Sequence, residues 1–127
     1  MKKILVVEDN KALALILKTR LEKESYSVDV VNGGMALLAY LRESKAPSAV
    51  ILDLFIPGIS GLELLDSLTN KWKGTRIFVY SAQANLKSAC LRYPGVCRFF
   101  SKSEDSQDLV AAINSELAAE DGGAPNI

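Results

Sequence analysis

Two continuous apolar runs that end in carboxylates constrain the fold of this chain more than any other feature. Ile4–Val7 leads into Glu8 and Asp9, and Ala49–Leu52 leads into Asp53. Short apolar runs without alternation are typical of parallel strands, because both faces of such strands are buried. Carboxylates are costly inside a strand, but at its carboxyl end they lie in the crevice where open α/β sheets bind ligands. The two runs therefore predict a parallel sheet with an acidic carboxyl edge.

Predicted strands and helices alternate along the chain. We expect strands at residues 3–7, 27–31, 49–52, 76–80 and 96–100, each followed by a helix. Right-handed crossovers then restrict the topology. The prediction is an α/β fold: a flavodoxin-like, doubly wound five-stranded parallel sheet in the order 2-1-3-4-5, with five helices distributed over both faces.

Each predicted helix carries an apolar stripe with helical spacing. The residues expected to be buried are Leu13, Ile16, Leu17 and Leu21; Met35, Leu38 and Leu41; Leu65, Leu68 and Trp72; Leu86, Ala89, Cys90 and Tyr93; and Leu109, Ala112, Ile113 and Leu117. Asn10 is the predicted cap of the first helix, and the last helix is expected to begin near Ser103. Pro57 and Gly58 predict a loop over residues 54–60.

The composition narrows the class of protein. The 127 residues predict one domain, which we place at 1–119, with 120–127 as a flexible tail or the start of a linker. Basic and acidic residues balance at 15 each and form no basic tract, which argues against direct nucleic-acid binding. The apolar runs are too short to span a membrane, and the acids at 8–9 end the first run too early for a signal peptide. We expect a cytoplasmic protein.

The chain contains no histidine, which excludes a His-based catalytic triad and argues against a zinc site. Its two cysteines, Cys90 and Cys97, lack the spacing of a metal site. We expect both to be reduced thiols that are partly buried.

The predicted strand order makes the first and third strands neighbours, so Asp9 and Asp53 should lie close together. Two adjacent carboxylates cannot both ionise cheaply without a cation. Mg²⁺ suits such a site, because it keeps several waters and binds through one or two carboxylates. Glu8 would complete the site through water. An oxygen of Asp53 that is not bound to metal could attack phosphorus and form an aspartyl phosphate.

Two further residues follow strands at the same edge of the sheet. Lys102 comes after the fifth strand and could supply an ammonium to a transferred phosphoryl group. Ser81 comes after the fourth strand and could donate a hydroxyl hydrogen bond. A single Lys or Ser in such a position is most often only a solvated loop residue. The functional interpretation depends on the strand ends carrying the required groups together.

A flavin mononucleotide site is the main rival at this edge of a flavodoxin-like sheet. The first loop, Glu8-Asp9-Asn10, is acidic and would repel the flavin phosphate. The first strand is also not followed by a glycine-rich phosphate motif. Both observations argue against the rival.

Taken as an ordered set, these residues resemble the receiver domain of two-component response regulators. The resemblance runs from Lys2 to about Leu117. Its motifs are Glu8 and Asp9 after the first strand, Asp53 after the third, Pro57 and Gly61 beyond it, Ser81 and Ala82 after the fourth, and Gly95, Phe99 and Lys102 around the fifth.

The resemblance implies a role for each matched residue. Asp53 would be the phosphoacceptor, and Ser81 and Lys102 would contact the phosphoryl group. The Mg²⁺ ligands would be Asp9, Asp53 and the backbone carbonyl of Phe55, with Glu8 as an outer-shell acid. Phe99 would be the switch aromatic, which turns inward when Ser81 shifts.

The resemblance also implies partners. The phosphoryl donor would be a histidine kinase or a histidine phosphotransfer protein. The surface of the fourth helix, fifth strand and fifth helix would control a downstream effector protein or a missing output domain. The chain would be a monomer or a phosphorylation-dependent dimer. It would not be an enzyme beyond catalysing its own phosphorylation and dephosphorylation.

The chain departs from the family pattern in its last loop and its fourth helix. Ser103 follows Lys102 where the family usually has proline, often with a cis peptide. A non-proline cis bond is expensive, so a trans Lys102–Ser103 bond is expected, and the reach of Lys102 is left open. The stretch from Ser81 to Lys102 is slightly short, which predicts a fourth helix that is either brief or mobile. The bulky Phe55 is expected to hinder water attack on a phosphorylated Asp53.

Two other functions are compatible with the same residues. A receiver-like scaffold could bind partners without phosphorylation. A small-molecule phosphatase would share the nucleophile and the metal, although the sequence contains no evident substrate-recognition cap. Uptake of a phosphoryl group would distinguish the phosphorylation switch from the scaffold. Turnover of phosphate esters would distinguish the phosphatase from the switch.

Overall fold

The computed structural model describes residues 1–122, and their side chains as far as Ala118. Its main sheet has five parallel strands in the order β2-β1-β3-β6-β7. The strands are β1 (Lys3–Val7), β2 (Ser27–Val31), β3 (Ala49–Leu52), β6 (Arg76–Ser81) and β7 (Val96–Ser101). This order is the predicted flavodoxin-like order 2-1-3-4-5, so the fold prediction is confirmed.

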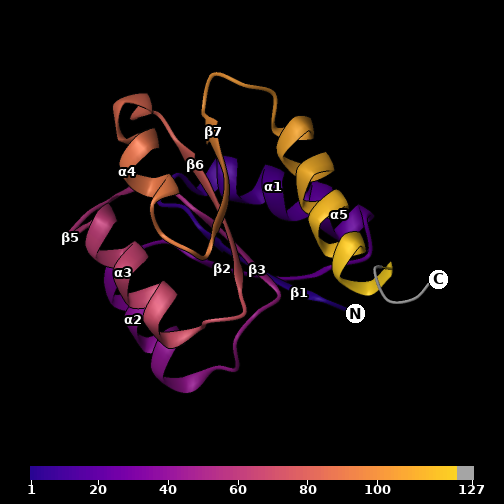
Figure 1. The fold of residues 1–127 in the computed structure, drawn as a ribbon, viewed down its shortest axis with the longest axis horizontal. Coiled ribbons are helices and arrows are strands. Elements are labelled where there is room, and N and C mark those ends of the chain that lie inside the picture. The colour runs from indigo at the N-terminus through magenta and orange to yellow at the C-terminus, as the bar shows by residue number, and fades with distance from the viewer. Residues whose placement is uncertain (123–127) are drawn as a thin grey trace.

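The described residues also form five α-helices, a 3₁₀ turn and a short hairpin. The helices are α1 (Lys11–Lys23), α2 (Gly34–Glu43), α3 (Gly61–Lys71), α4 (Lys87–Leu91) and α5 (Ser106–Gly122). The 3₁₀ turn η1 (Ala84–Leu86) precedes α4, and β4 (Phe55–Ile56) pairs antiparallel with β5 (Ile59–Ser60). Figure 1 shows α1 and α5 on one side of the sheet and α2, α3 and α4 on the other.

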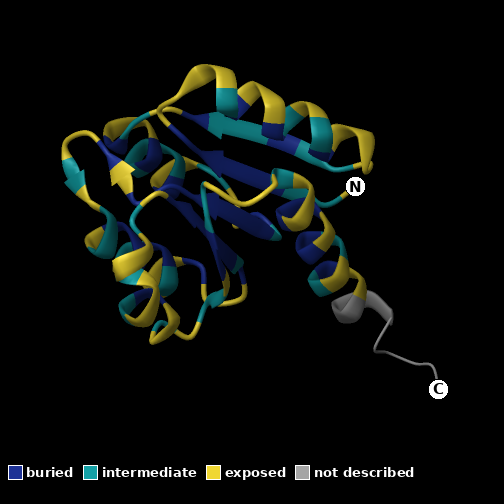
Figure 2. Ribbon diagram, turned by 90° about the horizontal axis from the view of Figure 1, so that it is seen from above, coloured by how far each residue is buried: buried dark blue, intermediate teal, exposed yellow. Residues whose placement is uncertain are grey.

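The core consists of two layers, one on each face of the sheet. Leu5 and Val7 of β1 pack in the cluster that includes α2, α3 and α4, whereas Ile4 and Val6 pack in the cluster with α1 and α5. Successive side chains of a strand point to opposite faces, so a strand covered on both faces must be apolar at every position. Figure 2 shows the buried central strands beneath helices whose outer faces are exposed. This burial explains the missing alternation in the sequence.

Two predicted core residues are exposed. Ile16 on α1 is 47% exposed and Met35 on α2 is 81% exposed, while Ala14 and Leu37 are buried. The sequence around each position is apolar on several sides, so more than one stripe with helical spacing fits it. The stripe that starts at Ala14 faces the sheet in α1, and the stripe through Leu37 does so in α2. The predictions that Ile16 and Met35 are buried were therefore wrong.

The structure also tests the predictions for the loop at residues 54–60, the start of the last helix and the length of the fourth helix. The expected loop at residues 54–60 contains the β4–β5 hairpin. Helix α5 begins at Ser106 rather than near Ser103, because the side chain of Asp105 accepts the Gln107 N–H and caps the helix there. Helix α4 is brief, as expected, and a turn at Pro94 separates it from β7.

The proposed boundary at residue 119 stays a prediction. Helix α5 runs to Gly122, and the rest of the predicted tail, residues 123–127, lies outside the described residues. Among the residues that the structure describes, no helix has the length and apolar character needed to cross a membrane.

Candidate functional site

Three carboxylates converge at the carboxyl edge of the sheet, as the sequence predicted. Strands β1 and β3 are paired in register with Val7 opposite Leu52, so the residues that follow them emerge side by side. Glu8, Asp9 and Asp53 each place a carboxylate oxygen within 4.8 Å of the others. The backbone fixes this edge, because the Asp53 N–H donates to the Val7 carbonyl at 3.0 Å.

The three acids differ in burial. Glu8 is 1% exposed and Asp53 is 3% exposed, whereas Asp9 is exposed. Buried carboxylates require a positive partner or hydrogen-bond donors, because desolvation penalises their charge.

Lys102 provides the positive partner. Its Nζ lies 2.8 Å from Oε1 of Glu8 and 2.9 Å from Oδ2 of Asp53. The sequence left its reach open, and the structure places the ammonium between the two buried acids with the Lys102–Ser103 peptide trans. The three carboxylates against one ammonium leave two negative charges, the charge that a divalent cation neutralises. The all-oxygen donor set also fits Mg²⁺.

The pKa values of the site reflect this balance. Burial raises the pKa of Glu8, although the hydrogen bonds from Lys102 and from the Asn10 backbone oppose the shift. Burial alone would lower the pKa of Lys102, but its contacts with the two carboxylates outweigh that cost and raise it. Lys102 is therefore held in the charged form, facing the acids.

Backbone donors hold the remaining oxygens of the two buried acids. Oε2 of Glu8 accepts the Asn10 N–H at 3.0 Å, and Oδ1 of Asp53 accepts the Phe55 N–H at 3.0 Å. Each of the two acids therefore contacts the Lys102 ammonium through one oxygen and accepts a backbone N–H through the other. Asn10 also caps α1, as predicted, since its Oδ1 accepts the Leu13 N–H. The carbonyl of Phe55 stays a predicted metal ligand.

Ser81 lies at the end of β6, beside the loop that carries Lys102. Its side chain is fully buried, and its Oγ accepts the Gln83 N–H at 3.0 Å. Its carbonyl accepts the Lys102 N–H at 2.9 Å, so the two predicted phosphoryl-contacting residues are joined through the backbone. With Oγ acting as an acceptor, the hydroxyl proton is the group that Ser81 can offer to a ligand.

The two phenylalanines have opposite environments. Phe99 on β7 is 9% exposed and packs in the core cluster shared with α2, α3 and α4, so its ring points inward in this structure. Phe55 on β4 is 68% exposed, two residues after Asp53. Their functional roles stay predictions.

One contact at the acidic edge was missed in the sequence. Asn32 follows β2, and its Nδ2 donates to the Glu8 carbonyl at 2.8 Å. The signal was available, because the end of β2 meets the same edge of the sheet and Asn32 is the polar residue directly after that strand.

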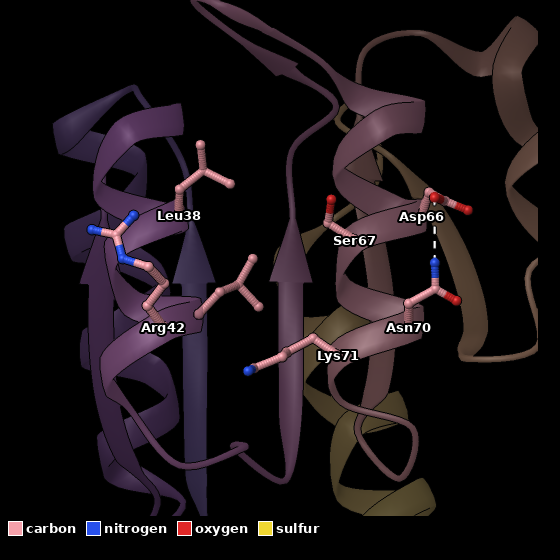
Figure 3. A pocket seen from close by; sticks show the side chains of 7 residues that line it. Leu38, Arg42, Asp66, Ser67, Asn70 and Lys71 are labelled. Atoms are coloured by element: carbon pink, nitrogen blue, oxygen red, sulfur yellow. Dashed lines mark hydrogen bonds between the residues drawn. The ribbon is translucent and has the colours of Figure 1, made fainter.

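A surface groove lies away from this edge. It measures about 630 Å³ between α2 and α3, and Figure 3 shows Leu38 and Arg42 on one wall with Asp66, Ser67, Asn70 and Lys71 on the other. Asn70 donates to Asp66 at 3.3 Å, which satisfies part of that wall internally. Since Glu8, Asp9, Asp53 and Lys102 do not line this groove, we place the candidate site at the sheet edge, where they lie together.

Known proteins are similar to the chain over most of its length. A family model described as the response regulator receiver domain matches residues 4–114. The response regulator ArlR of Staphylococcus epidermidis is 36% identical over 119 residues, covering 92% of this chain and 53% of ArlR. The phosphate regulon transcriptional regulatory protein PhoB of Rhizobium meliloti is 39% identical over 75 residues, covering 59% of this chain and 33% of PhoB. The chain thus spans about half the length of ArlR and a third of PhoB.

Solved structures of similar proteins have the same fold as this chain. The response regulator TrrA of Thermotoga maritima, crystallised with Mg²⁺ and BeF, superposes with a TM-score of 0.79 at 30% identity, covering 91% of this chain and 98% of that one. A CheY-like receiver domain protein from Methanospirillum hungatei gives a TM-score of 0.87 at 24% identity, covering 98% and 99%. The second likeness concerns the fold alone.

Proposed function

Because this chain belongs to the response regulator receiver domain family, we propose that it is a phosphorylation switch whose phosphoacceptor is Asp53. The observation that carries the proposal is the position of Lys102 Nζ, 2.9 Å from Oδ2 of Asp53, within a cluster that also contains Glu8 and Asp9. A nucleophilic carboxylate, a cation for the transferred group and oxygen ligands for a metal are thus assembled in one place.

The proposed metal is Mg²⁺. Asp9, Asp53 and the backbone carbonyl of Phe55 would hold it directly, and Glu8 would hold it through water. When bound, Mg²⁺ neutralises charge on the phosphoryl oxygens and on the acids around them.

The proposed transfer uses the chain's own side chains as follows. A carboxylate oxygen of Asp53 attacks phosphorus, and the bond from phosphorus to the donor's leaving atom breaks. With a phosphohistidine donor, the leaving imidazole nitrogen keeps the electron pair of that bond. Lys102 stays charged and follows the transferred group, while Ser81 offers its hydroxyl proton to a phosphoryl oxygen. Both residues therefore stabilise charge rather than transfer protons.

The same contacts can drive the switch. A phosphoryl group adds nearly two negative charges, which draw Lys102 and Ser81 from their present partners. Moving a population from mostly inactive to mostly active requires about 5.5 kcal/mol of differential stabilisation. We propose that Phe99, whose ring packs in the core layer of α2, α3 and α4, and the brief helix α4 respond to this change.

The proposed partners lie on both sides of this step. A histidine kinase or a histidine phosphotransfer protein would supply the phosphoryl group. An effector protein or an output domain would respond to the surface formed by α4, β7 and α5. Two of the similar proteins, ArlR and PhoB, are named as regulators, and the matched segment covers 53% and 33% of their lengths. A scaffold that ignores phosphorylation is not favoured, because the acids and the ammonium are assembled.

Phosphorylation by a small-molecule donor tests the proposal. We expect phosphoramidate with Mg²⁺ to add one phosphoryl group, seen by mass spectrometry of the intact protein. Asp53→Asn and chelation of Mg²⁺ should each abolish the uptake, while Asp108→Asn, a control on α5, should not. A phosphoryl group that persists in Asp53→Asn would overturn the site assignment. Repeated turnover of phosphate esters would favour a phosphatase instead.

A further inference from the structure

A closed polar turn carries the site lysine. We call the segment Ser101–Glu104 the lysine turn. The Glu104 N–H donates to the Ser101 carbonyl at 2.9 Å and closes the turn, while the Lys102 N–H donates to the Ser81 carbonyl at 2.9 Å. The turn is therefore fixed to β6 at one point, and Lys102 extends from it toward the acids.

The side chain of Glu104 closes the turn a second time. Its Oε2 accepts the Ser101 N–H at 2.8 Å. Strand β7 is the last strand of the sheet, and the Lys102 N–H points inward to β6. The N–H of the residue before it therefore points off the open edge, where no strand accepts it. A carboxylate acceptor there makes a short, charge-assisted hydrogen bond.

Two serine side chains complete the turn. The Oγ atoms of Ser101 and Ser103 lie 2.9 Å apart, and the Ser103 N–H donates to Oγ of Ser101 at 3.3 Å. These contacts constrain the backbone on both sides of Lys102 with a trans peptide and without a proline ring. A lysine has a long flexible stem, so the direction of its backbone decides how much of the time Nζ stands between two acids.

We propose that Glu104 is a positioning residue that holds Lys102 in register with Glu8 and Asp53, and so sets the rate of phosphoryl transfer to Asp53. The inference rests on the proposed function. Glu104 contacts neither acid in the structure, and its effect passes through the backbone of the lysine turn. Replacing its carboxylate should loosen the turn while Lys102 keeps its charge.

A double-mutant cycle with Lys102 tests this inference. The rate constant for phosphorylation by phosphoramidate is measured at saturating donor and Mg²⁺. Glu104→Ala should slow it about tenfold, since a misplaced reacting group costs rate steeply. Lys102→Ala should slow it about 100-fold, the usual loss for one charge-stabilising group. Adding Glu104→Ala to Lys102→Ala should change nothing further, because the residue to be positioned is absent.

Two single variants separate geometry from charge. Glu104→Gln keeps an acceptor oxygen for the Ser101 N–H and should recover most of the rate. Asp108→Ala removes the same charge four residues further along the chain, in the first turn of α5, and should behave as wild type. Urea unfolding confirms that each variant is folded under the assay conditions.

The outcomes that contradict the inference are distinct. A Glu104→Ala protein as fast as wild type overturns it, and so does an equal slowing by Glu104→Ala in the presence and absence of Lys102. Slowing by Asp108→Ala to the same extent would assign the effect to charge and would also overturn it. A wild-type protein that takes up no phosphoryl group overturns the proposed function, and the inference with it.

Discussion

Gly61 controls the path of the loop that follows the acidic edge. A Cβ at this position would lie 2.5 Å from the Leu54 carbonyl oxygen and 2.7 Å from the Leu54 Cβ, closer than real contacts allow. In an open helix, alanine would be favoured over glycine by about 1 kcal/mol. Here the obstacle is backbone, which cannot turn aside as a side-chain end can, so the clash decides the sign.

We expect Gly61→Ala to lower the free energy of unfolding by about 2 kcal/mol, as overpacking of a fixed site does. Urea denaturation measures the change. Gly74→Ala is the matched control, because a Cβ at Gly74 meets no atom within 4 Å. Similar stabilities for the two variants would show that the loop at Leu54 yields freely.

Phe55 joins the loop to the chemistry of Asp53. Its N–H donates to Oδ1 of Asp53, and the residue as a whole is 68% exposed. If the ring hinders water attack on the acyl phosphate, Phe55→Asn should shorten the phosphoryl lifetime about tenfold, equivalent to ~1.4 kcal/mol of barrier. The lifetime is measured by mass spectrometry, as the loss of the phosphorylated protein after a chelator is added. Leu91→Asn, another exposed apolar position, should leave the lifetime unchanged. A longer lifetime in Phe55→Asn contradicts the prediction.

At the scale of elements, one hydrogen bond ties α2 to β2. The Tyr40 hydroxyl donates to Oδ2 of Asp29 at 2.7 Å, and Lys3 contacts the same oxygen at 3.2 Å. The hydrogen bond from Tyr40 lowers the pKa of Asp29, with Lys3 assisting. Burial, and then Asp29, raises the pKa of Tyr40 well above its ordinary value near 10. The pair therefore stabilises the fold while Asp29 is ionised and Tyr40 is protonated.

We expect Tyr40→Phe to lower the free energy of unfolding by about 1 kcal/mol at pH 7, the usual net value of a hydrogen bond. The ring remains in both proteins and keeps its edge contact with Trp72. A depressed carboxyl pKa contributes stability above the unfolded value, near 4, and loses it as the pH falls. The difference between wild type and Tyr40→Phe should therefore shrink below about pH 4, as urea unfolding at pH 3 and 7 can show. A constant difference contradicts it.

Elements were predictable where one physical signal dominated. Continuous apolar runs located the central strands β1 and β3, because burial on both faces leaves no alternative pattern. The buried face of α1 was less certain, since Leu13 to Leu17 is apolar throughout and only packing selects Ala14 over Ile16. The start of α5 depended on which of several polar residues caps it, and the Asp105 side chain decides that through a contact with Gln107.

At the scale of the whole molecule, the acidic edge followed from topology. Once β1 and β3 are neighbours, Glu8, Asp9 and Asp53 must converge, and the sequence alone sufficed to predict it. The support for Lys102 could not be predicted in the same way. The hydrogen bond that the Ser101 N–H donates to Glu104 lies in a turn without apolar periodicity. The serines in the same turn also form hydrogen bonds there, so the sequence did not show which polar side chain would accept this N–H. Topology places strand ends, whereas local side-chain bonding places loops.

This convergence has a consequence for global stability. Three carboxylates face one ammonium, and two of the acids are buried, so the folded state contains repulsion that a divalent cation would relieve. A ligand that binds only the folded state stabilises it by RT ln(1 + [L]/Kd), about 2.7 kcal/mol at a hundredfold excess over Kd. The unfolded chain does not hold the three acids together and gains no such stabilisation.

We therefore expect Mg²⁺ to raise the free energy of unfolding of the wild type by about 2–3 kcal/mol at a concentration near 100 times its Kd, and a chelator to reverse it. Asp9→Asn should lose most of this gain, because it removes one of the three carboxylates that would hold the cation. Asp108→Asn removes an equal charge outside the cluster and should keep the full gain. Urea unfolding with and without Mg²⁺ measures all three. Equal stabilisation of Asp9→Asn and wild type would mean that the metal binds elsewhere, because the acidic edge would no longer account for the effect.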